Sequence, residues 1–113
     1  MRVVNISYDL EGDILEVRFA FGEEDNRTGI GLNEDVTIFC DRKYSELHGL
    51  TILAYSKLLA LPPQPLTELN EAPASVQKKV HALLKNKALQ PFLAFTNGNI
   101  RLHDIRVAKL AAA

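Results

Sequence analysis

The stretch that decides the fold is residues 14–21, which read Ile14-Leu15-Glu16-Val17-Arg18-Phe19-Ala20-Phe21. Large apolar side chains occupy the odd positions from 15 to 21, and charged or small side chains fill the even positions between them. Successive side chains of a β-strand point to opposite faces, so this period of two predicts a strand with one apolar face and one wet face. Such a strand is typical of an antiparallel sheet that packs on one side only.

The residues before this stretch predict its hairpin partner. Val4, Ile6 and Tyr8 alternate with smaller residues and share one face of a strand. The connection between the two strands is the turn-rich segment Asp9-Leu10-Glu11-Gly12-Asp13.

Three further strands are expected over residues 27–32, 36–40 and 47–54. Gly49 interrupts the last of these strands, either as a bulge or close backbone contact, which we favour, or as a tolerated weakness. The predicted apolar face of the sheet gathers Val4, Ile6, Leu15, Val17, Phe19, Ile30, Ile38 and Ile52.

The pattern changes after residue 54. Residues 54–61 are consistent with two helical turns or with an apolar extension, and the prolines of residues 62–65 predict a polyproline II spacer. Residues 73–87 predict a helix, because one apolar stripe recurs at helical spacing. The stripe consists of Val76, Val80, Leu83, Leu84 and the aliphatic stem of Lys87.

Asn97-Gly98 predicts a type I′ turn between strands over residues 92–96 and 100–107. The apolar alternation changes phase between Leu102 and Ile105, so we expect a bulge near His103 or a partly irregular strand.

These patterns predict an α+β fold: an antiparallel β-meander of about five strands, packed with one C-terminal α-helix and a C-terminal hairpin. Residues 1–61 form the sheet region, and residues 62–113 add the proline linker, helix and hairpin to the same domain. The 113 residues are enough for one hydrophobic core.

The sequence predicts a cytoplasmic protein. Its single cysteine, Cys40, cannot form an intrachain disulfide and suits a reducing compartment. The first residues lack the pattern of a secretory signal, and no apolar run approaches the ~20 residues that a membrane span needs.

The small net charge of −1 conceals an uneven distribution of charge. Residues 1–61 carry eleven acidic and six basic side chains, whereas residues 62–113 carry three acidic and seven basic ones. The basic half could approach the phosphates of a nucleic acid, or the two halves of different copies could attract each other. The candidate nucleic-acid residues are Lys78, Lys79, Lys85, Lys87, Arg101 and Arg106.

No motif predicts catalysis, a metal site or a cofactor. Residues 9–13 carry acidic side chains at alternate positions like a calcium loop, but the required glycine and glutamate are replaced by Ile14 and Ala20. His48, His81 and His103 fall on three different predicted elements. Cys40, Asp41, Ser45, His48 and Ser56 could form a nucleophilic group only by a coincidence of folding, and Cys40 is expected to be a buried thiol.

Two segments carry a resemblance to a known family. They are Tyr8-Asp9-Leu10-Glu11-Gly12-Asp13-Ile14-Leu15-Glu16-Val17, and the pair of strands over residues 36–41 and 47–56, of which the first ends in Asp41 and the second contains Gly49 and closes in Ser56. Over residues 4–58 the chain resembles a family of small bacterial proteins, the domain-of-unknown-function family 2283. The resemblance implies a small antiparallel β-meander that often self-associates, has no established catalytic residues, and in some relatives is a suspected antitoxin-like partner of a small toxin.

The function that the sequence predicts is a non-enzymatic module that binds itself or another protein. Because the predicted apolar face exceeds what one helix covers, we expect a homodimer that buries the remainder. The candidate self-association residues are Val17, Phe19, Phe21 and Ile52. The alternative is an antitoxin-like or nucleic-acid-associated regulator that uses the basic C-terminal half.

Overall fold

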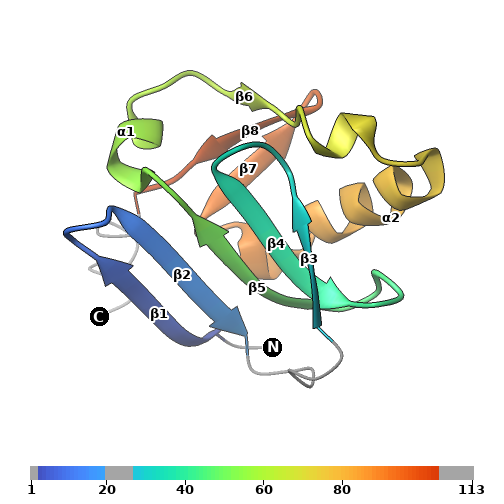
Figure 1. Ribbon diagram of the computed structural model, residues 1–113, viewed down its shortest axis with the longest axis horizontal. Helices are drawn as coiled ribbons and strands as arrows, with labels where there is room; N and C mark the ends of the chain where they lie inside the picture. Colours follow the sequence, from blue (N-terminus) through green and yellow to red (C-terminus); the bar gives the residue numbers. More distant parts are fainter. Residues whose placement is uncertain (1–2, 20–26, 105–113) are drawn as a thin grey trace.

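The computed structural model describes residues 3–19 and 27–104. These residues form a five-stranded sheet in which every neighbouring pair of strands is antiparallel (Figure 1). In chain order its strands are β1 (Val3–Asp9), β2 (Ile14–Phe19), β3 (Arg27–Gly31), β4 (Val36–Asp41) and β5 (Leu47–Ile52). In space their order is β1-β2-β5-β4-β3.

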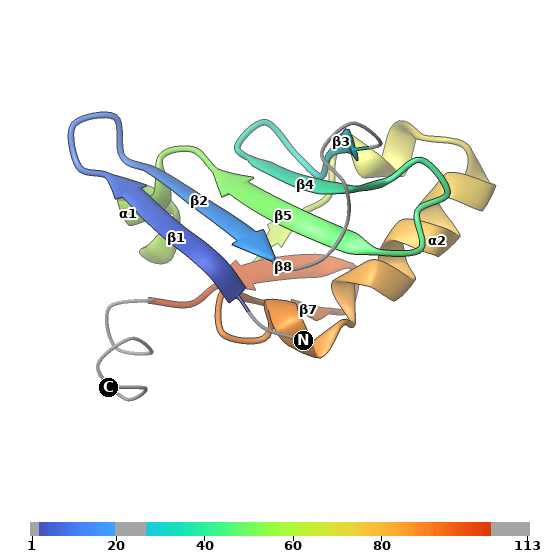
Figure 2. The same cartoon turned by 90° about the horizontal axis from the view of Figure 1, so that it is seen from below.

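A smaller sheet and the helices form a second layer under one face of the first sheet (Figure 2). The smaller sheet has the order β6-β8-β7, with β6 (Gln64–Pro65), β7 (Leu93–Thr96) and β8 (Asn99–Leu102). The helical segments are α1 (Tyr55–Leu59), α2 (Ala74–Leu84) and the short 3-10 turns η2 (Leu69–Glu71) and η3 (Lys87–Leu89). The predicted α+β class, with its antiparallel sheet and C-terminal hairpin, is confirmed.

The strand order differs from that of a simple meander, because β5 lies between β2 and β4. Gly49 makes this possible: it pairs with Arg18 on one side and with Phe39 on the other. A Cβ atom at this position would lie 2.8 Å from the backbone oxygen of Val17, closer than side chains are found in proteins. The predicted close backbone contact at Gly49 is therefore confirmed.

A bulge accompanies this close contact, one residue before it. Phe39 of β4 pairs with Gly49, and the next residue, Cys40, pairs with Leu47. His48 is thus the extra, unpaired residue of β5, and its side chain is buried.

The core lies between the two layers. Of the predicted apolar face, Leu15, Val17, Phe19, Ile38 and Ile52 are buried, and Ile30 is partly buried against them. Ile6 is 41% exposed, contrary to the prediction. The second layer lies behind β5 and β4, whereas β1 lies at the edge of the sheet away from β7, β8 and α2 (Figure 1). The side chain of Val4 lies outside the described part.

Helix α2 confirms the predicted helix but ends at Leu84, three residues early. Asn86 takes an extended conformation and is the N-cap of η3. Its side chain accepts a hydrogen bond from the Ala88 N–H. Lys87 therefore leaves the predicted stripe. Residues 55–59 form the short helix α1, so the helical alternative is correct there. None of the helices in the described ranges combines the length and the apolar character that a membrane crossing requires.

The proline-rich segment is more than the spacer that its sequence predicts. Gln64 and Pro65 form β6 and pair with Ile100 and Asn99 of β8. Proline is tolerated there because β6 is an edge strand, in which one side of the backbone needs no ladder hydrogen bond.

The C-terminal hairpin turns at Asn97 and Gly98, whose φ angles of 54° and 78° confirm the predicted turn. Strand β8 ends at Leu102, before the point at which the apolar alternation of the sequence changes phase. The hydroxyl of Tyr55 donates a hydrogen bond of 2.6 Å to the carbonyl oxygen of His103, which connects α1 to the end of this hairpin. Residues 105–107 of the predicted strand lie outside the described residues.

Replacing Gly49 with alanine tests the close approach of β5 to β2. Gly49→Ala is expected to lower the free energy of unfolding by about 1–3 kcal/mol, because the new methyl group meets a backbone atom that cannot move alone. Urea denaturation measures the change.

The matched control is Gly31→Ala. There the new methyl group meets only the carboxylate end of Glu68, a flexible side chain, so the cost should stay within about 0.5 kcal/mol. Equal losses of stability in the two variants would contradict the role given to Gly49.

Candidate functional site

Strand β1 is an open edge of the larger sheet. It pairs with β2 on one side, and within residues 3–19 and 27–104 no strand pairs with its other side. Residues 5–10 are all exposed. The backbone N–H and C=O groups of such an edge can hydrogen-bond to a strand of another chain.

Two apolar side chains of β1 lie exposed on the core face of the sheet. Ile6 pairs with Val17 and Tyr8 pairs with Leu15, so all four point to the same face. Val17 and Leu15 are buried, but Ile6 and Tyr8 are 41% and 38% exposed. The core face of the sheet therefore continues onto β1, where its side chains stay partly exposed to solvent.

The other described edges carry features that discourage pairing. Strand β3 begins with Arg27 and contains Gly29 and Gly31, and the Glu68 N–H donates to the Leu32 carbonyl just beyond its end. Strand β6 has two residues, one of them proline, and β7 has four residues. Strand β1 has seven residues and contains no glycine, proline, lysine or arginine. It is the least protected of these edges.

A carboxylate network holds the hairpin that presents β1. Asp13, with φ 56°, ends the turn between β1 and β2. Its Oδ1 accepts a hydrogen bond of 2.5 Å from the Tyr8 hydroxyl. Its Oδ2 accepts one of 2.7 Å from the Ser56 hydroxyl, and both oxygens accept from the Ser56 N–H. The Asp13 carbonyl also accepts from the Tyr55 N–H, so the hairpin is fastened to α1.

The donors around Asp13 favour its ionised form. The Tyr8 hydroxyl, followed by the N–H and hydroxyl of Ser56, holds the pKa of Asp13 below its ordinary value of 3.8. In the same turn, Asp9 accepts a hydrogen bond from the Glu11 N–H. These two carboxylates thus serve the turn, and the described part of the chain contains no group of three or more His, Cys, Asp or Glu residues that could hold a metal ion.

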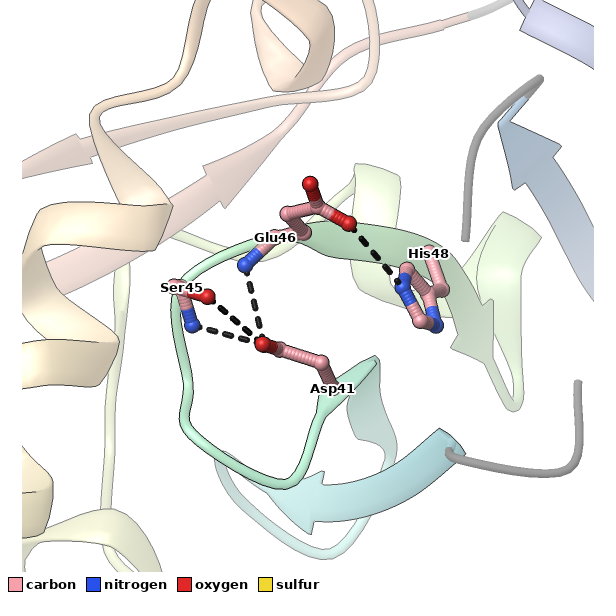
Figure 3. A network of polar contacts seen from close by, with 4 residues as sticks. All are labelled: Asp41, Ser45, Glu46 and His48. Carbon is pink, nitrogen blue, oxygen red and sulfur yellow. Dashed lines mark hydrogen bonds and ion pairs between the residues drawn. The ribbon is translucent and has the colours of Figure 1, made fainter. Parts of the chain in front are cut away.

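A second carboxylate network closes the turn between β4 and β5 (Figure 3). Asp41 accepts hydrogen bonds from the N–H and the hydroxyl of Ser45, at 2.6 and 2.5 Å, and from the Glu46 N–H at 2.9 Å. Desolvation alone would raise the pKa of Asp41, but the Ser45 hydroxyl and the two N–H groups outweigh it and lower the pKa to about 2.

His48 lies beside this turn and is only 7% exposed. Its Nε2 is buried and has no hydrogen-bond partner among the described residues, and a carboxylate oxygen of Glu46 lies 3.9 Å from it (Figure 3). The Ser45 hydroxyl donates to Asp41 itself. Ser45, His48 and Asp41 therefore lie near one another without the serine–histidine hydrogen bond that nucleophilic catalysis uses.

Of the other residues considered for chemistry, Cys40 adjoins Asp41 in β4, whereas His81 and Ser56 belong to helices and His103 follows β8. Cys40 is buried, as predicted, and burial, with a further contribution from the Asp41 charge, raises its thiol pKa to about 11. The His81 ring lies 5.2 Å from that of Phe95, and His103 Nδ1 lies 2.8 Å from the Gln90 carbonyl oxygen. Ser56 belongs to the Asp13 network.

The structure does not leave the predicted self-association residues free. Val17, Phe19 and Ile52 are buried in the core of the single chain, because the second sheet and α2 cover the face that was expected to need a second copy. Phe21 lies outside the described residues. On the core face of the sheet, the partly exposed side chains Ile6 and Tyr8 lie one strand further out, on β1.

The candidate nucleic-acid residues within the described part are all exposed. Lys78 and Lys79 belong to α2, Lys85 is its C-cap, Lys87 begins η3 and Arg101 lies in β8. Arg106 lies outside the described residues. Nucleic-acid binding stays a prediction.

The Asp41 network makes stability depend on pH. A carboxylate whose pKa is lower in the folded state stabilises the fold above its ordinary pKa of 3.8, and this contribution disappears as the pH falls toward 2. Asp41→Asn should lower the free energy of unfolding at pH 7 by about 1 kcal/mol, a small cost because the turn is largely in water.

Urea denaturation of both proteins between pH 7 and pH 2 measures this effect. The difference in stability between wild type and Asp41→Asn should be constant above about pH 4 and should shrink below it. A difference that stays the same down to pH 2 would show that the ionised carboxylate does not stabilise the turn.

Comparison of the chain with protein-family models, with curated proteins and with solved structures finds no match. The resemblance to the domain-of-unknown-function family 2283 therefore stays a prediction. The structure shows that its two segments meet, because the Tyr8 and Asp13 side chains of the first segment share one network with Ser56 of the second.

Proposed function

We propose that this protein is a non-enzymatic protein-binding module, and that it binds by adding a partner's strand to the open edge of β1. The observation that carries this proposal is the unprotected edge itself: β1 has seven residues, an exposed backbone edge, and two partly exposed apolar side chains on its core face. Backbone hydrogen bonds supply affinity in this mode of binding, and alternate side chains supply specificity.

The rigid presentation of β1 supports this function. Asn5 to Asp9 pair with β2 in unbroken register, and the Asp13 network holds the turn that follows. A strand that is already ordered loses little conformational freedom when a partner adds to it, so more of the contact energy appears as affinity.

The distribution of charge supports a protein partner. The acidic first half contains β1, and the basic second half contains the exposed lysines of α2. Separated charges of this kind orient an approaching protein and speed its encounter. A second copy and a toxin-like protein are the partners that the sequence suggests. We place this binding in the cytoplasm, because a single buried thiol suits a reducing compartment.

Copurification with a β1 variant tests the function. Ile6→Lys places a charge on the edge strand, which discourages strand addition. Leu53→Lys is the matched control, since Leu53 is 42% exposed and lies outside β1. The tagged proteins are expressed at native level, and mass spectrometry quantifies the proteins that copurify, including an untagged copy of the chain.

At least one protein should copurify with wild type and with Leu53→Lys, and its yield should fall about tenfold or more with Ile6→Lys. Circular dichroism confirms that each variant is folded. A set of copurifying proteins that is identical for all three baits would overturn the proposed use of β1.

A further inference from the structure

We propose that the strand added to β1 is β1 of a second copy, antiparallel, with Ser7 opposite Ser7 of that copy. This inference rests on the proposed function and names the partner. It follows from the side chains of β1, which complement themselves in this one register.

The register brings unlike, compatible side chains together. In an antiparallel pair centred on Ser7, Ile6 lies opposite Tyr8 of the second copy, and Asn5 lies opposite Asp9 of the second copy. A β-branched side chain against an aromatic ring is a favourable cross-strand pair, and the Asn5 amide can donate a hydrogen bond to the Asp9 carboxylate. The two-fold symmetry forms each pair twice.

The same register keeps like charges apart. Asp9 is the one charged residue of β1, and it lies at the end of the strand. With Ser7 at the centre, the two Asp9 side chains lie at opposite ends of the paired strands. Like charges directly opposite each other would destabilise the pair, and this arrangement avoids them.

Other registers lose these contacts. If Ile6 were the centre, Tyr8 would lie opposite Val4, where the pairing of β1 with β2 is irregular, and Val3 would lie opposite Asp9. If Tyr8 were the centre, Ile6 and Asn5 would lie opposite residues 10 and 11, which belong to the turn. Only the register centred on Ser7 uses the regular run from Asn5 to Asp9 and no more.

A shift by a single residue fails for a different reason. Paired residues of neighbouring strands point to the same face, so pairing Ser7 with Tyr8 would turn the core face of the second copy to the opposite side. With Ser7 at the centre, both copies keep their core faces on one side. The exposed Ile6 and Tyr8 side chains of the two copies then form one apolar patch.

The size of this contact sets the conditions of the experiment. Five residues of each chain pair with the other chain. The surface area that they bury is below that of a standard interface, so we expect a weak dimer. Protein concentrations of about 10 to 500 μM are therefore suitable.

Disulfide trapping tests the register. In an antiparallel pair the Cα atoms of opposite residues are about 4.5–5.5 Å apart, which allows a disulfide bond. When oxidised glutathione is added, Ser7→Cys should therefore form a disulfide between two copies of the chain. Glutathione accepts the two electrons that the two thiols lose. The matched control is Ser75→Cys, an exposed serine of α2. Cys40 should stay silent, because its buried thiol stays protonated at pH 8.

Analytical ultracentrifugation tests the interface in the uncrosslinked chain. Wild type and Leu53→Lys should dimerise with similar affinity. Ile6→Lys should raise the dissociation constant about tenfold or more, because one substitution changes both Ile6–Tyr8 pairs.

Three results would overturn the inference: a wild-type chain that stays at 12.6 kDa at 500 μM, equal trapping of Ser7→Cys and Ser75→Cys, or a dimer that Ile6→Lys leaves intact. The first result would leave the proposed function standing if copurification showed another protein that depends on Ile6. The proposed function itself would be contradicted if the same proteins copurified in the same yield with wild type and with Ile6→Lys.

Discussion

The close approach of the β5 and β2 backbones at Gly49 is the constraint on which the rest of the structure depends. A side chain at this position would collide with the Val17 carbonyl oxygen, so glycine is what allows β5 to approach β2 this closely while it also pairs with β4. This placement pairs Leu15 with Ile52 and Val17 with Leu50, which builds the centre of the buried face. It also determines the edges of the sheet. With β2, β5 and β4 as the inner strands, β1 and β3 remain as the two edge strands.

The second layer then determines which edge is open. The smaller sheet and α2 cover the inner strands, and the chain near Glu68 hydrogen-bonds to the end of β3. From residues 3–19 and 27–104, strand β1 receives neither kind of cover, although Ile6 and Tyr8 point to the core face. The carboxylate of Asp13 ties the turn of this hairpin to α1, so the open edge is held in place. An ordered edge with apolar side chains, whose one charged residue lies at its end, is suited to strand pairing, and the proposed function follows from this combination.

Much of the fold could be predicted from local patterns, because alternation, the Asn97-Gly98 turn and the helical stripe of α2 act within a few residues. The position of β5 could not, because it depends on pairing between residues distant in the chain. The exposed apolar side chains of β1 could not be predicted either, because their exposure also depends on contacts between residues distant in the chain. Ile6 and Val17 have the same alternation, and only the extent of the second layer makes one exposed and the other buried. One signal in the sequence could have identified β1: it lacks the glycine and arginine residues of β3 and the proline of β6, and it is longer than β7.

Hydrogen exchange of the backbone amides tests directly whether β1 pairs with β1 of a second copy. Amides that point outward from an open edge exchange with water quickly, and pairing slows them. We expect amides between Asn5 and Asp9 to exchange more slowly at 500 μM than at 5 μM protein, whereas amides of β3 should exchange at the same rate at both concentrations. Exchange of the β1 amides that does not change with protein concentration would rule out the pairing of β1 with a second copy.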